Sequence, residues 1–339
     1  MRKAIVIGGV SVKAGQRCTV DLDVPDLYTH TGITLPVQVI HGKVSGPALF
    51  LSGALHGDEI NGVEIIRRIL KNKLMNSLKG TLLAVPVVNI YGFINKTRYL
   101  PDRRDLNRSF PGSETGSLAA RMANVFLREI VAKCTHGIDL HTAAIHRDNM
   151  PHIRALMDDP ETKRVARAFA LPVILNTSIV AGSLRESAEK SGVTVIVYEA
   201  GEALRFDEDS IQRGTDGILS VMREIGMLPR LKKARTKKLE PLVAQSSTWV
   251  RAPESGILRA MKTLGEPVHK NELMGVISDP FGKKEEEVRA TANGIIIGRT
   301  NIPLVNEGEA LFHIARFKTT YELEDQLEEI QNYMNPSEE

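Results

Sequence analysis

A histidine and a glutamate stand close together where an apolar run gives way to a helical pattern: His56 and Glu59, in FLSGALHGDEINGVEII (residues 50–66). An imidazole nitrogen and a carboxylate oxygen are ordinary zinc ligands, but a catalytic zinc ion takes three protein ligands and keeps one position open for water. The third candidate is His141, in IDLHTAA, at the end of another apolar run. We expect both runs to be strands that open onto one crevice, because ligands bind at the carboxyl edge of open α/β sheets. The three residues therefore predict a metal site.

A further carboxylate, Glu199, follows Tyr198 near the end of the apolar segment 193–201. Burying a carboxylate at the end of such a segment costs free energy unless the charge is needed there. We expect Glu199 to be the general base that takes a proton from water at a hydrolytic metal site. A structural glutamate held in a salt bridge is the alternative.

The segment TRYLPDRRDLNRSFPG, residues 97–112, holds four arginines between two prolines and reads as a fixed loop. Arginine suits the bidentate capture of a carboxylate and the stabilisation of an oxyanion. We expect Asn107 and Arg108, enclosed by apolar neighbours, to face inward. For Arg103 and Arg104 we expect a solvated surface position.

These side chains must be positioned by alternating strands and helices. Nearly continuous apolar runs, typical of strands covered on both faces, occupy 48–54, 81–89, 137–142, 171–176 and 193–201. Helical stripes occupy 60–70, 118–130 and 165–170. The alternation predicts an α/β domain with a mostly parallel sheet.

The pattern changes after the basic run 230–238, which we interpret as a solvated linker. Residues 246–318 contain short β segments. They also contain a weak internal repeat: PESGIL (253–258) followed by GEPV (265–268) is similar to ANGIII (292–297) followed by GEA (308–310). We therefore expect a catalytic domain over 1–235, a compact all-β domain over 246–318 and an acidic tail over 319–339.

Composition limits the possible functions. The chain has 339 residues, a hydrophobic share of 42% and a net charge of only +3, so a nucleic-acid partner is not expected. Two distant cysteines, Cys18 and Cys134, argue against disulfides and thiolate metal sites. The N-terminal apolar run is too short for a signal peptide or a membrane span, so we expect no membrane partner and a cytoplasmic location.

In order and spacing, HGDE, DLNRSFPG, DLH and YEAGE resemble the succinylglutamate desuccinylase/aspartoacylase family, a branch of the zinc carboxypeptidase superfamily. The resemblance covers about residues 45–215. It implies a three-layer α/β/α fold like that of the zinc carboxypeptidases and one zinc ion per chain, held by His56, Glu59 and His141. It also implies a small N-acylated amino acid as substrate, hydrolysed at its amide bond.

The resemblance implies further residue roles. Glu199 is the base and acid, Asn107 and Arg108 grip the substrate carboxylate, and Asp105 orients a ligand histidine. Arg98 would polarise the scissile carbonyl, with Arg103 or Arg104 as alternatives. Apart from the resemblance, the segment IHRDNMPHIRA offers His146, His152 and Arg154 as candidates for the pocket wall and equally for ordinary surface positions.

The segment 246–318 resembles a biotinyl/lipoyl-type barrel-sandwich. Its Ala260-Met261-Lys262 lies outside the hairpin that carries the modified lysine in carrier domains, so we expect no attached biotin or lipoate. An exposed β domain could also supply a contact in a homo-oligomer. The rival functions are a zinc carboxypeptidase for short peptides and a non-catalytic binding or carrier protein with a vestigial metal site.

Overall fold

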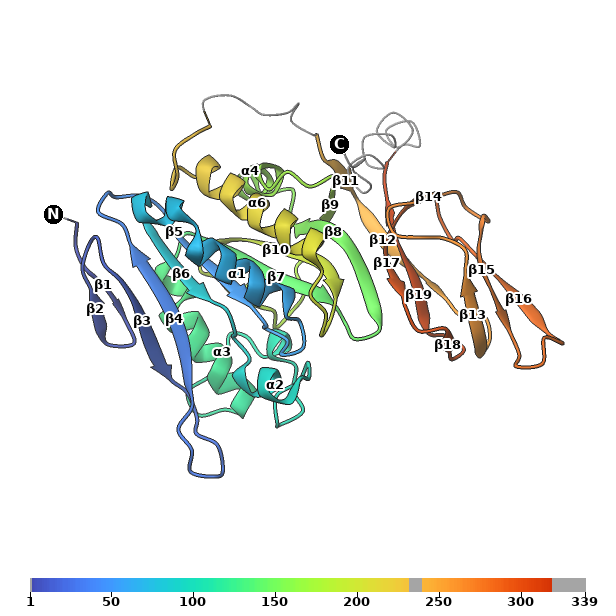
Figure 1. Ribbon diagram of the computed structural model, residues 1–339, viewed down its shortest axis with the longest axis horizontal. Coiled ribbons are helices and arrows are strands. Elements are labelled where there is room, and N and C mark those ends of the chain that lie inside the picture. Colours follow the sequence, from blue (N-terminus) through green and yellow to red (C-terminus); the bar gives the residue numbers. More distant parts are fainter. Residues whose placement is uncertain (1, 232–239, 319–339) are drawn as a thin grey trace.

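One long sheet organises the described part of the chain, which comprises residues 2–231 and 240–318 of this computed structural model. The bounds of its thirteen strands are β3 Arg17–Asp23, β4 Thr34–His41, β5 Ala48–Gly53, β6 Thr81–Val85, β7 His136–Ala143, β8 Arg147–Ala155, β9 Val173–Asn176, β10 Thr194–Glu202, β11 Leu242–Ala244, β12 Ser246–Arg251, β14 Pro267–Val268, β17 Gly294–Thr300 and β19 Ala310–Arg316. The main path runs β12-β19-β17-β8-β10-β7-β5-β6-β4-β3, with β9, β11 and β14 pairing to its side (Figure 1).

Along the main path, the middle of this sheet is parallel and the flanks are antiparallel, while the side strands β9 and β11 pair in parallel. Strand β5 pairs in parallel with β6 and β7, and β7 pairs in parallel with β10. The prediction of a mostly parallel sheet is wrong for the flanks, where β4 runs antiparallel to β6 and β8 runs antiparallel to β10. Only residues 144–146 separate β7 from β8, whereas a parallel return needs a crossover of about a dozen residues. The sheet is therefore mixed, within the α/β class that the sequence predicted.

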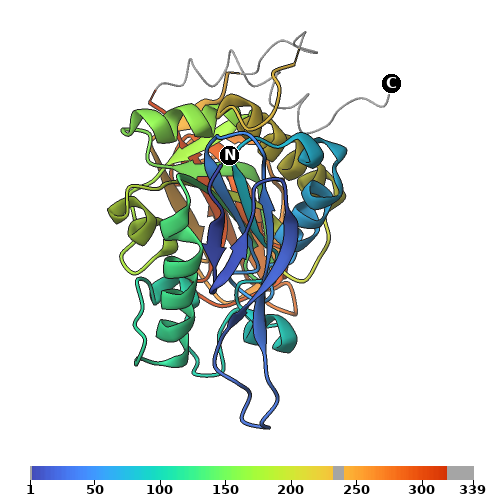
Figure 2. The same cartoon turned by 90° about the vertical axis from the view of Figure 1, so that its left-hand side faces the viewer.

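Helices cover both faces of the sheet. One buried apolar cluster is shared by three of them: α1 (Asn61–Lys71), α4 (Pro160–Ala168) and α6 (Glu208–Glu224). A second cluster contains α3 (Leu118–Glu129), α5 (Leu184–Lys190) and the small hairpin of β1 (Ile5–Ile7) and β2 (Val10–Val12). Figure 2 shows α1 in blue and α3 in green on opposite sides of the sheet. Helices α1 and α3 confirm two of the three helical stripes that the sequence predicted, whereas the third, 165–170, runs two residues past the end of α4.

Short polar side chains begin several of these helices. Ser117 accepts a hydrogen bond from the Ala120 amide at the start of α3, and Asp159 accepts one from Thr162 at the start of α4. Such residues satisfy amides that the first helical turn leaves unpaired. They fix where each helix begins against the sheet.

The strands after β11 form the C-terminal β module, residues 246–316. Besides the strands already listed it contains β13 (Gly256–Ala260), β15 (Leu273–Ser278), β16 (Glu285–Arg289) and β18 (Leu304–Val305), in a second sheet of order β16-β15-β13-β18. The two echoed units interlock, because β13 pairs with β18 and β14 pairs with β17. Strand β17 also pairs with β8, so the module continues the sheet of the first part of the chain.

Two expectations fall on residues outside this description. The linker 230–238 lies almost wholly, and the tail 319–339 wholly, outside the described ranges. Among the described helices, none combines the length and apolar character that a membrane span requires.

Candidate active site

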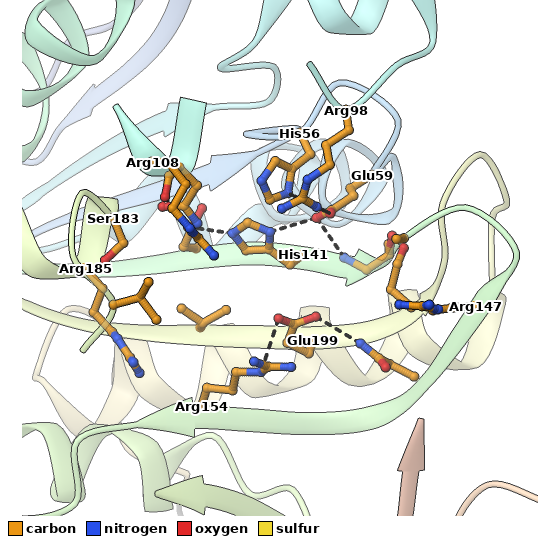
Figure 3. A pocket seen from close by; sticks show the side chains of 18 of the residues that line it. His56, Glu59, Arg98, Arg108, His141, Arg147, Arg154, Ser183, Arg185 and Glu199 are labelled. Atoms are coloured by element: carbon orange, nitrogen blue, oxygen red, sulfur yellow. Dashed lines mark hydrogen bonds and ion pairs between the residues drawn. The ribbon is translucent and has the colours of Figure 1, made fainter. Parts of the chain in front are cut away.

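Three side chains from the carboxyl ends of β5 and β7 converge in one buried cluster (Figure 3). His56 and Glu59 lie in the connection from β5 to α1, and His141 lies in β7. One potential ligand atom from each residue lies within 4.8 Å of the others, and each residue is at most 5% exposed. The structure thus brings together the three residues that the sequence predicted as metal ligands.

The Glu59 carboxylate lies between the two imidazoles. Its Oε1 is 2.7 Å from His56 Nδ1, and its Oε2 is 2.7 Å from His141 Nδ1. The backbone amide of Thr142 also donates to Oε2 at 3.2 Å. The Nδ1 atoms are therefore the nitrogens that face the centre of the cluster.

The outer nitrogen of each histidine meets another carboxylate. His56 Nε2 is 3.1 Å from Asp105 Oδ1, and His141 Nε2 is 2.7 Å from Asp139 Oδ2. Ser52 donates to the other oxygen of Asp139 at 2.7 Å. A carboxylate on the outer nitrogen fixes the tautomer and raises the basicity of the inner nitrogen, as in many metal sites. The donor set can therefore hold a metal ion.

Local sequence explains how His56 reaches this position. A Cβ on Gly57 would lie 2.0 Å from the carbonyl carbon of Gly92 and 2.2 Å from the amide nitrogen of Phe93, both in the backbone of α2 (Ile90–Asn95). Only glycine allows this close approach. The HGDE segment therefore packs tightly against α2.

The other acid of this segment, Asp58, is also buried. Burial, followed by the Glu59 charge, raises the pKa of the Asp58 carboxyl group.

Asp105 has a second, structural function. Its Oδ1 accepts a hydrogen bond from the Asn107 amide at 2.8 Å, which caps the short 3-10 helix η2 (Leu106–Arg108). Its Oδ2 accepts one from Arg98 at 2.9 Å. The aspartate of DLNR therefore holds the loop and the ligand histidine together.

Mutual attraction outweighs burial in the electrostatics of the cluster. Burial raises the pKa of Glu59, but the charges of His56 and His141 bring it well below its ordinary value. Burial lowers the pKa of His141, but the charges of Asp139 and Glu59 raise it well above its ordinary value. The carboxylates of the cluster therefore favour positive charge on the two imidazoles. A metal cation at this site would compete with protons for the same nitrogens.

Glu199 lies across the same cavity, in β10. The cavity has a volume of about 260 Å³ and is lined by the three clustered residues as well as by Glu199. Asn149 donates to Glu199 Oε2 at 3.0 Å, and Arg154 Nε lies 3.3 Å from Oε1. Both partners belong to β8, the strand antiparallel to β10. A Cβ on Gly298 of β17 would lie 2.8 Å from Asn149 Oδ1, so the C-terminal β module packs directly against the Asn149 side chain.

The arginines of the loop 97–112 separate into two groups. Arg98 lines the cavity and contacts Glu59 at 3.3 Å, whereas Arg103 and Arg104 are exposed and lie outside the cavity wall. Asn107 and Arg108 also line it, although Arg108 as a whole is exposed rather than enclosed. The expected inward position of Arg108 is therefore correct only for its contribution to the cavity wall.

Residues 45–225 match the family model of the succinylglutamate desuccinylase/aspartoacylase catalytic domain, which covers more than half of the chain. The chain belongs to this family. A curated relative, the N-alpha-acetyl-L-2,4-diaminobutyric acid deacetylase of Halomonas elongata, is 26% identical over 294 residues, which cover 84% of this chain and 86% of the relative.

Solved structures of the family share the fold. The succinylglutamate desuccinylase/aspartoacylase from Rhodobacter sphaeroides has a TM-score of 0.79 at 24% identity, covering 88% of this chain and 95% of that one. The product-bound ectoine utilization protein EutE (DoeB) from Ruegeria pomeroyi gives the same TM-score, identity and coverage. A match over 88% of this chain extends beyond residue 225 and into the C-terminal β module.

Several cavity residues of this family member escape prediction from the sequence: Asp139, Asn149, Arg147, Ser183, Arg185 and Trp249. Asp139 did have a signal, because residues two apart in a strand share a face and His141 is two residues on. Three residues were candidates for either the pocket wall or the surface. Arg154 lines the cavity, His152 is fully buried and His146 is exposed.

Proposed function

We propose that this family member is a zinc-dependent deacylase that hydrolyses the amide bond between a small acyl group and an amino acid. The observation that carries this proposal is the cluster of His56, Glu59 and His141 facing Glu199 across one cavity. The name of the Halomonas elongata relative, which describes removal of an acetyl group from an amino acid, supports the reaction class. Helices on both faces of the sheet support a layering like that of the zinc carboxypeptidases.

The donor set suits zinc. Two imidazole nitrogens and one carboxylate are a ligand set of catalytic zinc sites, in which the remaining position faces the substrate. When bound, zinc acts as a Lewis acid that acidifies water and polarises a carbonyl oxygen. Asp105 and Asp139 would keep both histidines oriented for this ion.

Glu199 would move the proton. It takes a proton from the attacking water, whose oxygen joins the acyl carbon, and gives that proton to the amino-acid nitrogen as the C–N bond breaks. The products are a carboxylic acid and a free amino acid. Asn149 and Arg154, one on each oxygen of Glu199, would hold this carboxylate in position.

The arginines would bind the charged parts of the substrate. Arg98 contacts Glu59 and Asp105, which hold its guanidinium beside the metal cluster, where it would stabilise the developing oxyanion. Arg108 donates to the Asn107 carbonyl and has no carboxylate partner among the described residues. Together with the Asn107 amide it would grip the carboxylate of the amino acid.

A substitution at the base tests the proposal. Glu199→Gln should keep its zinc content and lose 10²- to 10⁴-fold in kcat on N-acyl amino acids, because only proton transfer is removed. Glu202→Gln, on the same strand but outside the cavity wall, is the matched control. Turnover of Glu199→Gln within threefold of wild type, or full activity after removal of all metal, contradicts the mechanism.

A further inference from the structure

Strand β8 carries an extra residue beside Glu199. The pairing of β8 with β10 slips by one residue there, so that Met150 and Pro151 lie opposite the single residue Ala200. Two residues facing one form a β-bulge, a feature that re-aims side chains and is common next to active sites. Proline within a sheet is largely confined to edges and bulges, because it has no amide hydrogen for the ladder. Pro151 therefore favours irregular pairing at this point of an inner strand.

The bulge determines which side chains of β8 face the cavity. Successive residues of a regular strand point to opposite faces, so Asn149 and Arg154, five residues apart, would lie on opposite faces. In the structure both line the cavity. Asn149 donates to Glu199 Oε2 at 3.0 Å, and Arg154 Nε lies 3.3 Å from Oε1 on the other side of the carboxylate (Figure 3). The extra residue thus allows one strand to contact both oxygens of Glu199.

His152 closes this bulge with its side chain. The ring is fully buried, and its Nδ1 lies 2.7 Å from the carbonyl oxygen of Met150, two residues earlier. A carbonyl oxygen only accepts, so Nδ1 carries the hydrogen. Burial, followed by the Arg154 charge, lowers the pKa of His152 to about 3, so the imidazole is neutral at physiological pH. Within the described ranges Nε2 has no hydrogen-bond partner, so the hydrogen bond of this ring serves the bulge.

The C-terminal β module limits Asn149 on its other side. Gly298 of β17 lies opposite Asn149 in the register, and a Cβ there would come within 2.8 Å of Asn149 Oδ1. Glycine at this position leaves the amide room to turn toward Glu199. Pairing of β8 with β17 ends at Asn149, and pairing with β9 begins at Ile153. The bulge therefore lies where β8 changes from one neighbouring strand to the other.

We propose that His152 is a positioning residue for Glu199. It holds the bulge, and the bulge places Asn149 and Arg154 at the two oxygens of the carboxylate. This inference rests on the proposed function, in which Glu199 is the base. A carboxylate held at both oxygens keeps its orientation toward the water whose proton it takes, and a displacement of about 1 Å can cost about 100-fold in rate. His152 thus affects turnover without touching the substrate.

The first test is His152→Leu in the zinc-loaded enzyme, assayed on the N-acyl amino acid that wild type hydrolyses fastest. We expect kcat to fall by about 10- to 100-fold, with zinc content unchanged and KM within about threefold, because His152 is not part of the cavity wall. His152→Asn should restore most of kcat, since its amide nitrogen can take the position of Nδ1 and donate to Met150.

The matched control is His41→Leu. His41 is also a buried histidine that contacts a backbone carbonyl, that of Lys3 at 2.9 Å, but it lies in β4 and outside the cavity wall. His41→Leu should lower stability and leave kcat unchanged. If His152→Leu also retains kcat within about twofold of wild type, the inference is overturned.

A second background separates positioning from general stability. In Glu199→Gln the base is absent, so adding His152→Leu should not lower the residual rate further, because both changes act on one function. An equal loss in both backgrounds would mean that His152 only supports the fold, and it would overturn the inference.

A further variant keeps the inference testable if His152→Leu does not fold. Asn149→Ala removes one of the two contacts to the base and should lower kcat by about tenfold, the range for a hydrogen bond to a charged group. Gly298→Ala, whose Cβ would displace the Asn149 amide, should give a similar loss alone and none in Asn149→Ala. Full kcat in Asn149→Ala overturns the inference.

Crystal structures distinguish this inference from the proposed function. If wild type hydrolyses no N-acyl amino acid, the proposed function fails. Structures of zinc-loaded wild type and His152→Asn, compared with His152→Leu, then still test the positioning. Loss of a contact from Asn149 or Arg154 to Glu199 in His152→Leu alone supports it, and unchanged contacts in all three refute it.

Discussion

Replacing Asp139 should weaken metal binding although Asp139 is not itself a ligand. Its Oδ2 is 2.7 Å from His141 Nε2, and its Oδ1 accepts from Ser52 at 2.7 Å. Asp139 and His141 are 2% and 5% exposed, so water cannot replace the carboxylate. The loss of Asp139 should therefore lower the basicity of Nδ1, on the opposite side of the imidazole, and weaken its bond to a metal ion.

The magnitude follows from the charge. Asp139→Asn keeps an acceptor but loses its charge, and charged and neutral hydrogen bonds differ by about 1 to 1.5 kcal/mol, or roughly tenfold in the dissociation constant for zinc. Asp139→Ala removes the acceptor and leaves Ser52 without its partner, so we expect about 100-fold.

The dissociation constant should be measured by competition with a chromophoric chelator at fixed pH. The control is Asp102→Asn, because that carboxylate accepts from the backbone amides of Arg104 and Ala119 rather than contacting a ligand. Dissociation constants within twofold of wild type for both Asp139 variants would refute the reasoning, since His141 would then need no orienting carboxylate.

Two further predictions concern stability, measured by urea unfolding. Gly57→Ala should lower the free energy of unfolding by about 3 kcal/mol or more, because its Cβ meets backbone that cannot move aside, whereas Gly32→Ala should be nearly neutral; equal effects would contradict the packing argument. His313 has a folded pKa of about 3 and an unfolded pKa near 6.5, so between these values the unfolded chain binds one more proton and stability falls as pH falls. His313→Phe should remove about 1.4 kcal/mol per pH unit from the pH dependence of the unfolding free energy between pH 6 and 4. The control His269→Phe, at an exposed position, should leave that dependence unchanged. If His313→Phe also leaves it unchanged, His313 is not buried in its neutral form.

The central strands and the metal cluster could be predicted because their signals are local. Apolar runs end at His56, His141 and Glu199, and the carboxyl ends of neighbouring parallel strands necessarily meet at one edge. The helical stripes that became α1 and α3 are equally local, since each is set by the spacing of apolar residues within a few turns.

The rest depends on contacts between segments far apart in the chain. The antiparallel placement of β8 gives Glu199 its partners Asn149 and Arg154, and no spacing near Glu199 indicates it. Trp249 reaches the cavity only because β17 pairs with β8, and its own neighbours in sequence carry no sign of this contact. Pairings of this kind are decided by tertiary packing rather than by local pattern.

The pairing of β17 with β8 has a consequence for any attempt to shorten the protein. In a fragment that stops before β11, β9 would lack its partner β11 and the beginning of β8 would lack its partner β17. The backbone amides and carbonyls along these edges would then be unpaired. Open edges of this kind recruit other chains and promote aggregation. A chimera that joins the first part of this chain to the C-terminal module of another protein would therefore need a glycine opposite Asn149 in the same register.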